Sequence, residues 1–201
     1  PEYAVKDDFT FVKEAVAFEE ALQRAYNHRA DLLSLSAKKT AAEKTIDLAK
    51  KGYYPVLTGN ANYYYNGDEF PLNKNWTIGA TLNFPLFTGL STKYQVEEAK
   101  SALNVLNANE VALRQNIHLE VKQAYLALKE AEDRIDTLDL TVRQANENYD
   151  LANGRYASGV GSPIEVTDAL LTVSNAKLAY IVALYDYKTA QGKIKKAMGM
   201  R

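Results

Sequence analysis

Apolar residues recur at helical spacing along one very long stretch of the chain. From 91 to 153 there is no glycine or proline, and the gaps between apolar or small positions are mostly 3 and 4. A heptad-like stripe of this kind predicts one helix that packs along a partner, about 95 Å long at 1.5 Å per residue. Glu110 is its one charged member, and the stripe comprises positions 99, 103, 106, 110, 113, 117, 121, 124, 128, 131, 135, 138, 142, 145, 149 and 152.

The same period returns over residues 163–198, which predicts a second, shorter helix antiparallel to the first. Its stripe comprises positions 166, 170, 173, 177, 180, 184, 187, 191, 194 and 198, with Lys177 and Gln191 as polar members. The shorter helix covers about half of the longer one, so we expect another helix to cover the rest. Alanines on several faces favour a layer of neighbouring helices, and a plain two-stranded coiled coil stays open as the alternative.

Two shorter helices are expected near the N-terminus, which makes the fold mainly α. The first has Asp8 or Thr10 as its N-cap and runs for about 17 residues. The second spans about 31–51, with Asp31 as a plausible N-cap and Gly52 as a plausible C-cap. It is the helix we expect beside the uncovered part of the long one.

Between these helices the period changes to two, which predicts a β-hairpin of strands at about 55–66 and 75–86. One face of the hairpin is apolar in both strands, and the other carries Thr and Asn. Strands of this length and pattern suit an outer membrane, with apolar side chains toward lipid. By pattern alone, an ordinary surface hairpin on a helical core is the commoner interpretation. The apolar face comprises Leu57, Gly59, Ala61, Tyr63 and Tyr65 with Trp76, Ile78, Ala80, Leu82 and Phe84.

The segment RYASGVGSPIEV, residues 155–166, separates the two long helices. Gly159 and Gly161 permit a reversal of the chain, because glycine tolerates backbone conformations that other residues avoid. Ser162 and Pro163 are suited to restart a helix as N-cap and first-turn residue. The segment therefore predicts the turn of an antiparallel helical hairpin.

Composition excludes several classes of protein. The 201 residues carry 24 basic and 25 acidic side chains, a balance that does not favour nucleic acid as a partner. Cysteine is absent, so no disulfide framework or thiolate metal site is expected. No apolar run reaches the roughly 18 residues of a membrane helix. The N-terminus lacks the features of a signal peptide, and the chain is expected to be mature or trimmed.

No catalytic constellation is present in the sequence. His28 and His118 are the two histidines, and both are expected to be surface or packing residues of helices. The GVGSP segment has neither the spacing nor the preceding strand of a phosphate-binding loop. The acidic residues of the long helix are expected on its solvated face, and we predict no enzyme, cofactor or metal site. These acidic residues are Glu97, Glu98, Glu130, Glu132 and Asp133.

Several segments, in order, resemble outer membrane efflux proteins, the TolC-like channels. The clearest is WTIGATLNFPLFTGLSTKYQVEEAKSALN, where a strand ends at a Pro85-Leu86-Phe87-x-Gly89 turn before a long helix; Leu90 stands where a second glycine is common. Further segments are RADLLSLSAKKTAAEKTIDLAKKGYYPVLT, EVKQAYLALKEAEDRI and RYASGVGSPIEVTDALLTVSNAKLAYIVALYDYKTAQGKIKKAMG. The resemblance spans nearly the whole chain and matches only the second, C-terminal repeat of the family, about half of a usual protomer.

The resemblance implies a TolC-like α-barrel/β-barrel repeat, with N-terminal helices at 1–54, the hairpin at 55–87 and tunnel helices at 88–201. It implies an outer membrane location with a periplasmic extension in a Gram-negative bacterium. It also implies passive export of drugs, metals or proteins, with lipid, a membrane-fusion adaptor and an inner-membrane pump as partners. Self-association would be trimeric in the full-length family, and six copies are conceivable for one repeat. The rival hypothesis is a structural or adaptor-type coiled-coil hairpin that binds helices without forming a pore.

The resemblance also implies roles for particular residues. The turn would be the periplasmic tip, acting as gate and docking site, with Glu165 and Asp168 as a carboxylate pair; their alternative role is to face the positive end of the helix dipole. Gly161 stands where the best-known member has an arginine. Tyr63, Tyr65 and Trp76 would lie at the membrane interface, with simple aromatic packing as the alternative. The tip set is Tyr156, Gly159, Gly161, Ser162, Glu165 and Asp168.

Overall fold

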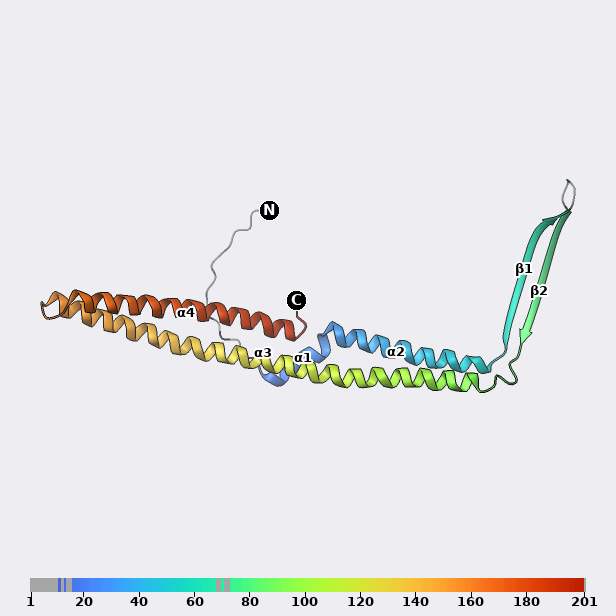
Figure 1. The fold of residues 1–201 in the computed structure, drawn as a ribbon, viewed down its shortest axis with the longest axis horizontal. Coiled ribbons are helices and arrows are strands. Elements are labelled where there is room, and N and C mark those ends of the chain that lie inside the picture. The colour runs from blue at the N-terminus through green and yellow to red at the C-terminus, as the bar shows by residue number, and fades with distance from the viewer. Residues whose placement is uncertain (1–10, 12, 14–15, 68–69, 71–72, 201) are drawn as a thin grey trace. The chain divides into compact units, whose positions relative to one another are not determined.

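The computed structural model describes residues 11, 13, 16–67, 70 and 73–200. It confirms the expected fold class, a mainly helical chain with one antiparallel pair of strands (Figure 1). The chain divides into two compact units, one formed by residues up to 32 and from 112 onward, the other by residues 33–111. The elements are α1 (Phe18–His28), α2 (Ala30–Lys50), the 3₁₀ turn η1 (Lys51–Tyr53), β1 (Val56–Asn66), β2 (Asn73–Asn83), α3 (Ser91–Ala157) and α4 (Pro163–Ala197).

In the first unit, α4 runs antiparallel along the C-terminal part of α3 (Figure 1). Every predicted stripe position of α3 from 113 onward is buried or half-buried. Residues at 121, 128 and 135 take one heptad position and those at 124, 131 and 138 take the other, and all six are buried or half-buried, so both heptad positions face the same neighbour. Burial of this apolar seam is what holds the helical hairpin together.

The predicted stripe of α4 was wrong at two positions, Leu170 and Lys177, which are exposed. Alanines at every seventh residue take the second heptad position instead. Small side chains at that position let the two helix backbones approach closely, while Leu170 and Lys177, each one residue further along, stay in solvent. The buried alanines are Ala169, Ala176, Ala183, Ala190 and Ala197.

Helix α1 adds a third layer to this unit. It begins at Phe18, later than predicted, and residues 16 and 17 are not helical; Asp8 and Thr10 lie outside the described residues. The Phe18 ring makes edge contacts with His118 and Tyr125, at centroid distances of 5.5 and 5.8 Å. Tertiary packing of these aromatic rings, rather than a side-chain cap, fixes where the helix starts.

The prediction that Glu132 lies on the solvated face of the long helix was wrong. The residue is buried, with 1% of its surface exposed. Lys13 and Phe18 contact α3 at Asp136 and Tyr125, on either side of Glu132 along the helix. Lys129 donates a hydrogen bond of 2.9 Å to the Oε2 atom, while Oε1 has no partner. The heptad pattern could not reveal this burial, because it comes from the third layer.

In the second unit, α2 covers the N-terminal part of α3, as expected (Figure 1). Ile46 is buried on α2, and Val96 and Ala99 are buried on α3. Glu110, the charged member of the predicted stripe, forms an ion pair with Lys39 of α2, whose Nζ lies 2.6 Å from the carboxylate. A half-buried ion pair at one position of an apolar seam favours a single register between the two helices.

Gly52 does not act as the predicted C-cap. It lies inside η1 without a left-handed backbone, and a Cβ at this position would come within 2.9 Å of the Thr92 methyl group. The glycine is therefore explained by close approach to the start of α3, not by the reversal of a helix end.

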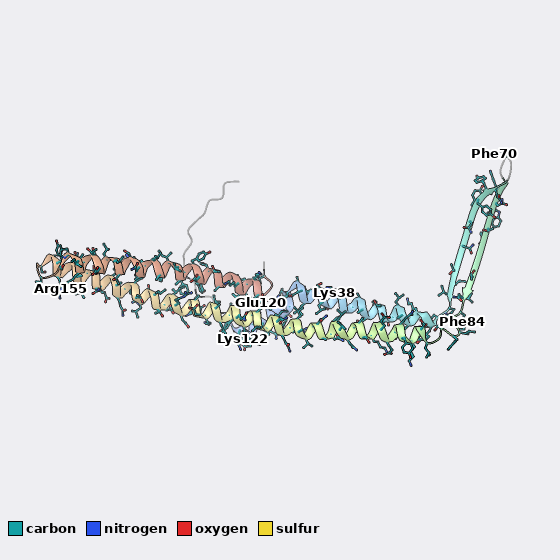
Figure 2. The ribbon with its side chains drawn as sticks, in the orientation of Figure 1. Lys38, Phe70, Phe84, Glu120, Lys122 and Arg155 are labelled. Carbon is teal, nitrogen blue, oxygen red and sulfur yellow. The ribbon has the colours of Figure 1, made fainter. Side chains whose placement is uncertain are left out.

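Strands β1 and β2 pair so that the two predicted apolar faces form one surface. Leu57 lies opposite Leu82, and Tyr63 opposite Trp76. Strand β2 begins earlier than predicted and ends at Asn83, so Phe84 lies beyond it. Figure 2 shows Phe84 at the helix end of the hairpin and Phe70 beyond the opposite end. The surface is uncovered within the chain, with Trp76 70% and Ile78 75% exposed.

Candidate functional site

The turn that joins α3 to α4 is built on a Schellman motif. Gly159 has a left-handed backbone with φ of 75°, which costs other residues energy. Its N–H donates to the Tyr156 carbonyl at 3.0 Å, and the Val160 N–H donates to the Arg155 carbonyl at 3.0 Å. These two bonds satisfy carbonyls that would otherwise be left open where α3 ends, and they fix the reversal of the chain.

Gly161 is required for a different reason, since its backbone is not left-handed. A Cβ at this position would lie 2.8 Å from the Tyr156 nitrogen and 3.0 Å from the Arg155 backbone carbon. The Gly161 N–H donates to the Arg155 carbonyl at 3.0 Å. No side chain fits between the turn and the last turn of α3, so this geometry explains why an arginine does not occupy position 161.

Ser162 and Pro163 start α4 in the way that the sequence predicts. Ser162 has an extended backbone, and its side-chain oxygen accepts a hydrogen bond of 3.2 Å from the Ile164 N–H. Pro163 is the first residue of the helix, where its missing N–H is no loss. The cap sets the direction in which the first two turns of α4 present their side chains.

The first turns of α4 bring Glu165 and Asp168 into one groove with the end of α3. The groove has a volume of about 690 Å³, and Arg155 lines it beside the two carboxylates; Figure 2 shows Arg155 at the tip of the helical hairpin. Tyr156 is 49% exposed and stands outside the lining of this groove. The lining residues are Asn148, Leu151, Ala152, Arg155, Glu165, Asp168, Ala169 and Thr172.

Arg155 is the groove residue that reasoning from the sequence missed. Its Nε lies 3.7 Å from the Glu165 carboxylate, which makes an ion pair across the turn. A signal for it does exist, because a basic residue in the last turn of one helix and an acidic residue in the first turn of the next both complement the helix dipoles. A short turn between such helices brings these two charges together.

The three aromatic residues expected at a membrane interface lie on the apolar face of the strand pair. Tyr63, Tyr65 and Trp76 are all exposed, and the rings of Tyr63 and Tyr65 meet edge to face at 5.5 Å. They come from both strands, near the turn of the hairpin. Their aromatic packing and their exposure occur together, so both roles that the sequence suggests are compatible with the structure.

The described part of the chain offers little chemistry beyond these charges. No group of three or more metal-ligating side chains occurs among the residues that the structure places. His28 contacts the Arg24 carbonyl at 3.0 Å, and His118 packs on Phe18, so each lies in a helix contact. Within the same described ranges, no helix has the length and apolarity needed to cross a membrane.

The fold and the groove describe a helical hairpin with a charged tip. The same chain carries a strand pair whose apolar face is exposed. The family model for outer membrane efflux proteins matches residues 21–200. The chain therefore belongs to the outer membrane efflux protein family. This family consists of channels, not enzymes, and the outer membrane location that the sequence predicts is the location of the family.

Named relatives agree with this membership. The outer membrane efflux protein BepC of Brucella suis is 26% identical over 182 residues, covering 89% of this chain and 40% of the relative. The outer membrane protein TolC of Salmonella enteritidis is 25% identical over 193 residues, covering 89% and 39%. The open MtrE outer membrane channel of Neisseria gonorrhoeae shares the fold with a TM-score of 0.77 at 21% identity, covering 94% of this chain and 43% of that one. The chain thus spans about two-fifths of the length of the relatives it matches.

Proposed function

We propose that this chain is one repeat of an outer membrane channel that passively exports solutes, either drugs, metals or proteins. A periplasmic adaptor and an inner-membrane pump would deliver the solute and supply the energy. The observation that carries the proposal is the match to the efflux family over residues 21–200, which includes both the strand pair and the helical hairpin. An adaptor-type coiled coil has no need of an exposed apolar strand pair, so this feature favours the channel.

The strand pair is the part of the chain that we place against lipid. Its apolar face is exposed along its whole length, from Leu57 opposite Leu82 to Tyr63 opposite Trp76. Aromatic side chains at one end of such a face are typical of the level of the lipid headgroups. Tyr63, Tyr65 and Trp76 would therefore mark one membrane boundary.

The turn between α3 and α4 is the part that we propose as the periplasmic tip. Gly159, Gly161 and Ser162 shape it, and Tyr156 is exposed beside it, available to an adaptor. Glu165 and Asp168 line one groove there. A ring of such carboxylates, one set from each repeat, would narrow the entrance and favour cations.

Self-association is supported by a second apolar stripe on each long helix. Leu171, Leu178 and Tyr185 are exposed at heptad spacing on α4, and Leu119 and Leu126 at the same spacing on α3. Each stripe lies opposite the buried seam of its own helix, so a further helix could pack on either side of the hairpin. A trimer of full-length protomers, or six copies of a single repeat, would provide those neighbours.

The test is conductance of the assembled protein that contains this chain, in a planar lipid bilayer. We expect a cation-selective conductance, and the double substitution Glu165→Ala with Asp168→Ala should lower the selectivity. Glu97→Ala with Glu98→Ala removes the same charge from the other end of α3 and should leave the selectivity unchanged. An assembled protein that binds partner helices but does not conduct would support the structural hairpin and rule out the channel.

A further inference from the structure

The turn at the tip fixes the backbone of Arg155. Its carbonyl accepts two hydrogen bonds of 3.0 Å, from the N–H groups of Val160 and Gly161. The missing side chain of Gly161 lets the turn lie directly against the Arg155 backbone. The position from which the guanidinium extends is therefore set by the turn itself, and its Nε reaches to within 3.7 Å of the Glu165 carboxylate.

This ion pair is too weak to act as a lock. The Arg155 and Glu165 side chains are 61% and 51% exposed, and the distance between the charged atoms exceeds that of a hydrogen bond. Exposed pairs of this kind contribute little to stability and are screened by salt. The reversal is held by the backbone bonds of the turn and by the Ser162 cap. What Arg155 adds to the groove is a fixed positive charge.

That charge changes the electrostatics of the groove. Two carboxylates and one guanidinium line it, and an arginine stays protonated at every physiological pH. Glu165 has Arg155 as its neighbour, whereas none of the charged side chains that the structure describes lies within ion-pair distance of the Asp168 carboxylate. The groove of each chain therefore presents one net negative charge, centred on Asp168, instead of two.

We infer that Arg155 is a selectivity-determining residue, which offsets Glu165 and leaves Asp168 as the carboxylate that attracts cations to the entrance. The inference rests on the proposed channel function, because it assigns a role to the same groove. In this role Arg155 acts through its charge and not through its shape. A purely structural role for the same side chain would depend on its shape instead.

The experiment is the reversal potential of the assembled channel in a KCl gradient. Arg155→Gln should raise the permeability ratio of potassium to chloride by about twofold, because it removes the positive charge that offsets the Glu165 carboxylate in each chain. Arg155→Lys keeps the charge and should match the wild type. Arg143→Gln is the matched control, since Arg143 is an exposed α3 arginine that pairs with Asp139 at 3.4 Å and does not line the groove.

A charge swap tests the partnership if single variants assemble poorly. Arg155→Glu should shift the reversal potential toward cations and Glu165→Arg toward anions, and the double variant should return to the wild-type value. A conducting channel in which Arg155→Gln leaves the reversal potential unchanged would overturn the inference, as would an equal shift in Arg155→Lys. A wild-type assembly without conductance contradicts the channel itself, so the two failures are distinguishable.

Discussion

At the scale of single residues, Arg29 joins three parts of the first unit through one guanidinium. It bonds Asp31 at 2.8 Å and Glu120 of α3 at 2.6 Å, and it reaches the Ala197 carbonyl at the end of α4 at 3.4 Å. The hydrogen bond to Asp31 raises the pKa of Arg29, with burial opposing and Glu120 adding to the rise. Gly199 lies close to the Arg29 backbone and has a left-handed φ of 76°; an added Cβ would be 3.1 Å from the Arg29 backbone nitrogen, a tight contact.

Asp31 shows how this cluster should respond to pH. The hydrogen bond from Arg29 lowers the pKa of the Asp31 carboxyl, so the carboxylate stabilises the fold above the unfolded pKa of about 3.9. The contribution is lost as the pH falls from there through the lower folded pKa. Because the side chain is 39% exposed, Asp31→Asn should cost only about 0.5 kcal/mol at pH 7, and the cost should shrink as the pH falls below about 3.9.

Chemical denaturation of both proteins across this pH range measures the difference in the free energy of unfolding. Asp47→Asn is the matched control, because Asp47 makes a more exposed pair with Lys50, at 3.4 Å, within one helix. It should change the free energy of unfolding by less than Asp31→Asn does. A difference for Asp31→Asn that grows toward acid pH would contradict the assigned direction of the pKa.

At the scale of elements, the tip contains three glycines that the structure explains differently. Gly154 lies in the last turn of α3 with open space around it, and its φ is ordinary. Gly159 also has open space but has a left-handed φ. Gly161 has an ordinary φ but no room, because backbone atoms of α3 occupy the place of a side chain. Alanine at each position therefore probes a separate physical effect.

Thermal unfolding should rank the three alanine variants. Gly154→Ala should stabilise by about 0.5–1 kcal/mol, since alanine is the better helix former. Gly159→Ala should destabilise by about 1–2 kcal/mol through backbone strain, and Gly161→Ala by about 1–3 kcal/mol through steric overlap with α3. A stabilised Gly161→Ala variant would show that the turn does not lie against α3 in this way.

Prediction from sequence succeeds for elements whose pattern is repeated many times. The period-two pattern placed Leu57 and Leu82 on the same face of the strand pair, and the heptads of α3 predicted its buried seam. Each pattern repeats because the same neighbouring element contacts the residues along its whole length. Prediction failed at Glu132 and at the start of α1, where residues far apart in the chain create the environment. In the groove it singled out Glu165 and Asp168 but not Arg155, because the contact of that cation with Glu165 depends on how closely the turn brings the two helix ends together.

At the scale of the whole molecule, the described helices leave apolar surface that the chain does not cover. On α4 the exposed stripe of Leu171, Leu178 and Tyr185 lies opposite the seam that faces α3. A helix with two apolar faces is typical of a layer in which each helix has two neighbours. This matches the heptad alanines of α4, which let one neighbour approach closely, while Leu171, Leu178 and Tyr185 remain for a neighbour on the other face.

Leu178→Glu tests whether this second face packs in the assembled protein. Covering a leucine is worth about 1.5–3 kcal/mol, so placing a carboxylate there should weaken self-association at least about tenfold per contact. Native mass spectrometry or light scattering measures the assembled fraction, and circular dichroism should show unchanged helix content because Leu178 lies outside the buried seam. Lys177→Glu places the same side chain on the neighbouring exposed position and should leave assembly nearly intact. Equal loss in both variants would assign the effect to charge on α4, and unchanged assembly in both would mean that the stripe faces no helix.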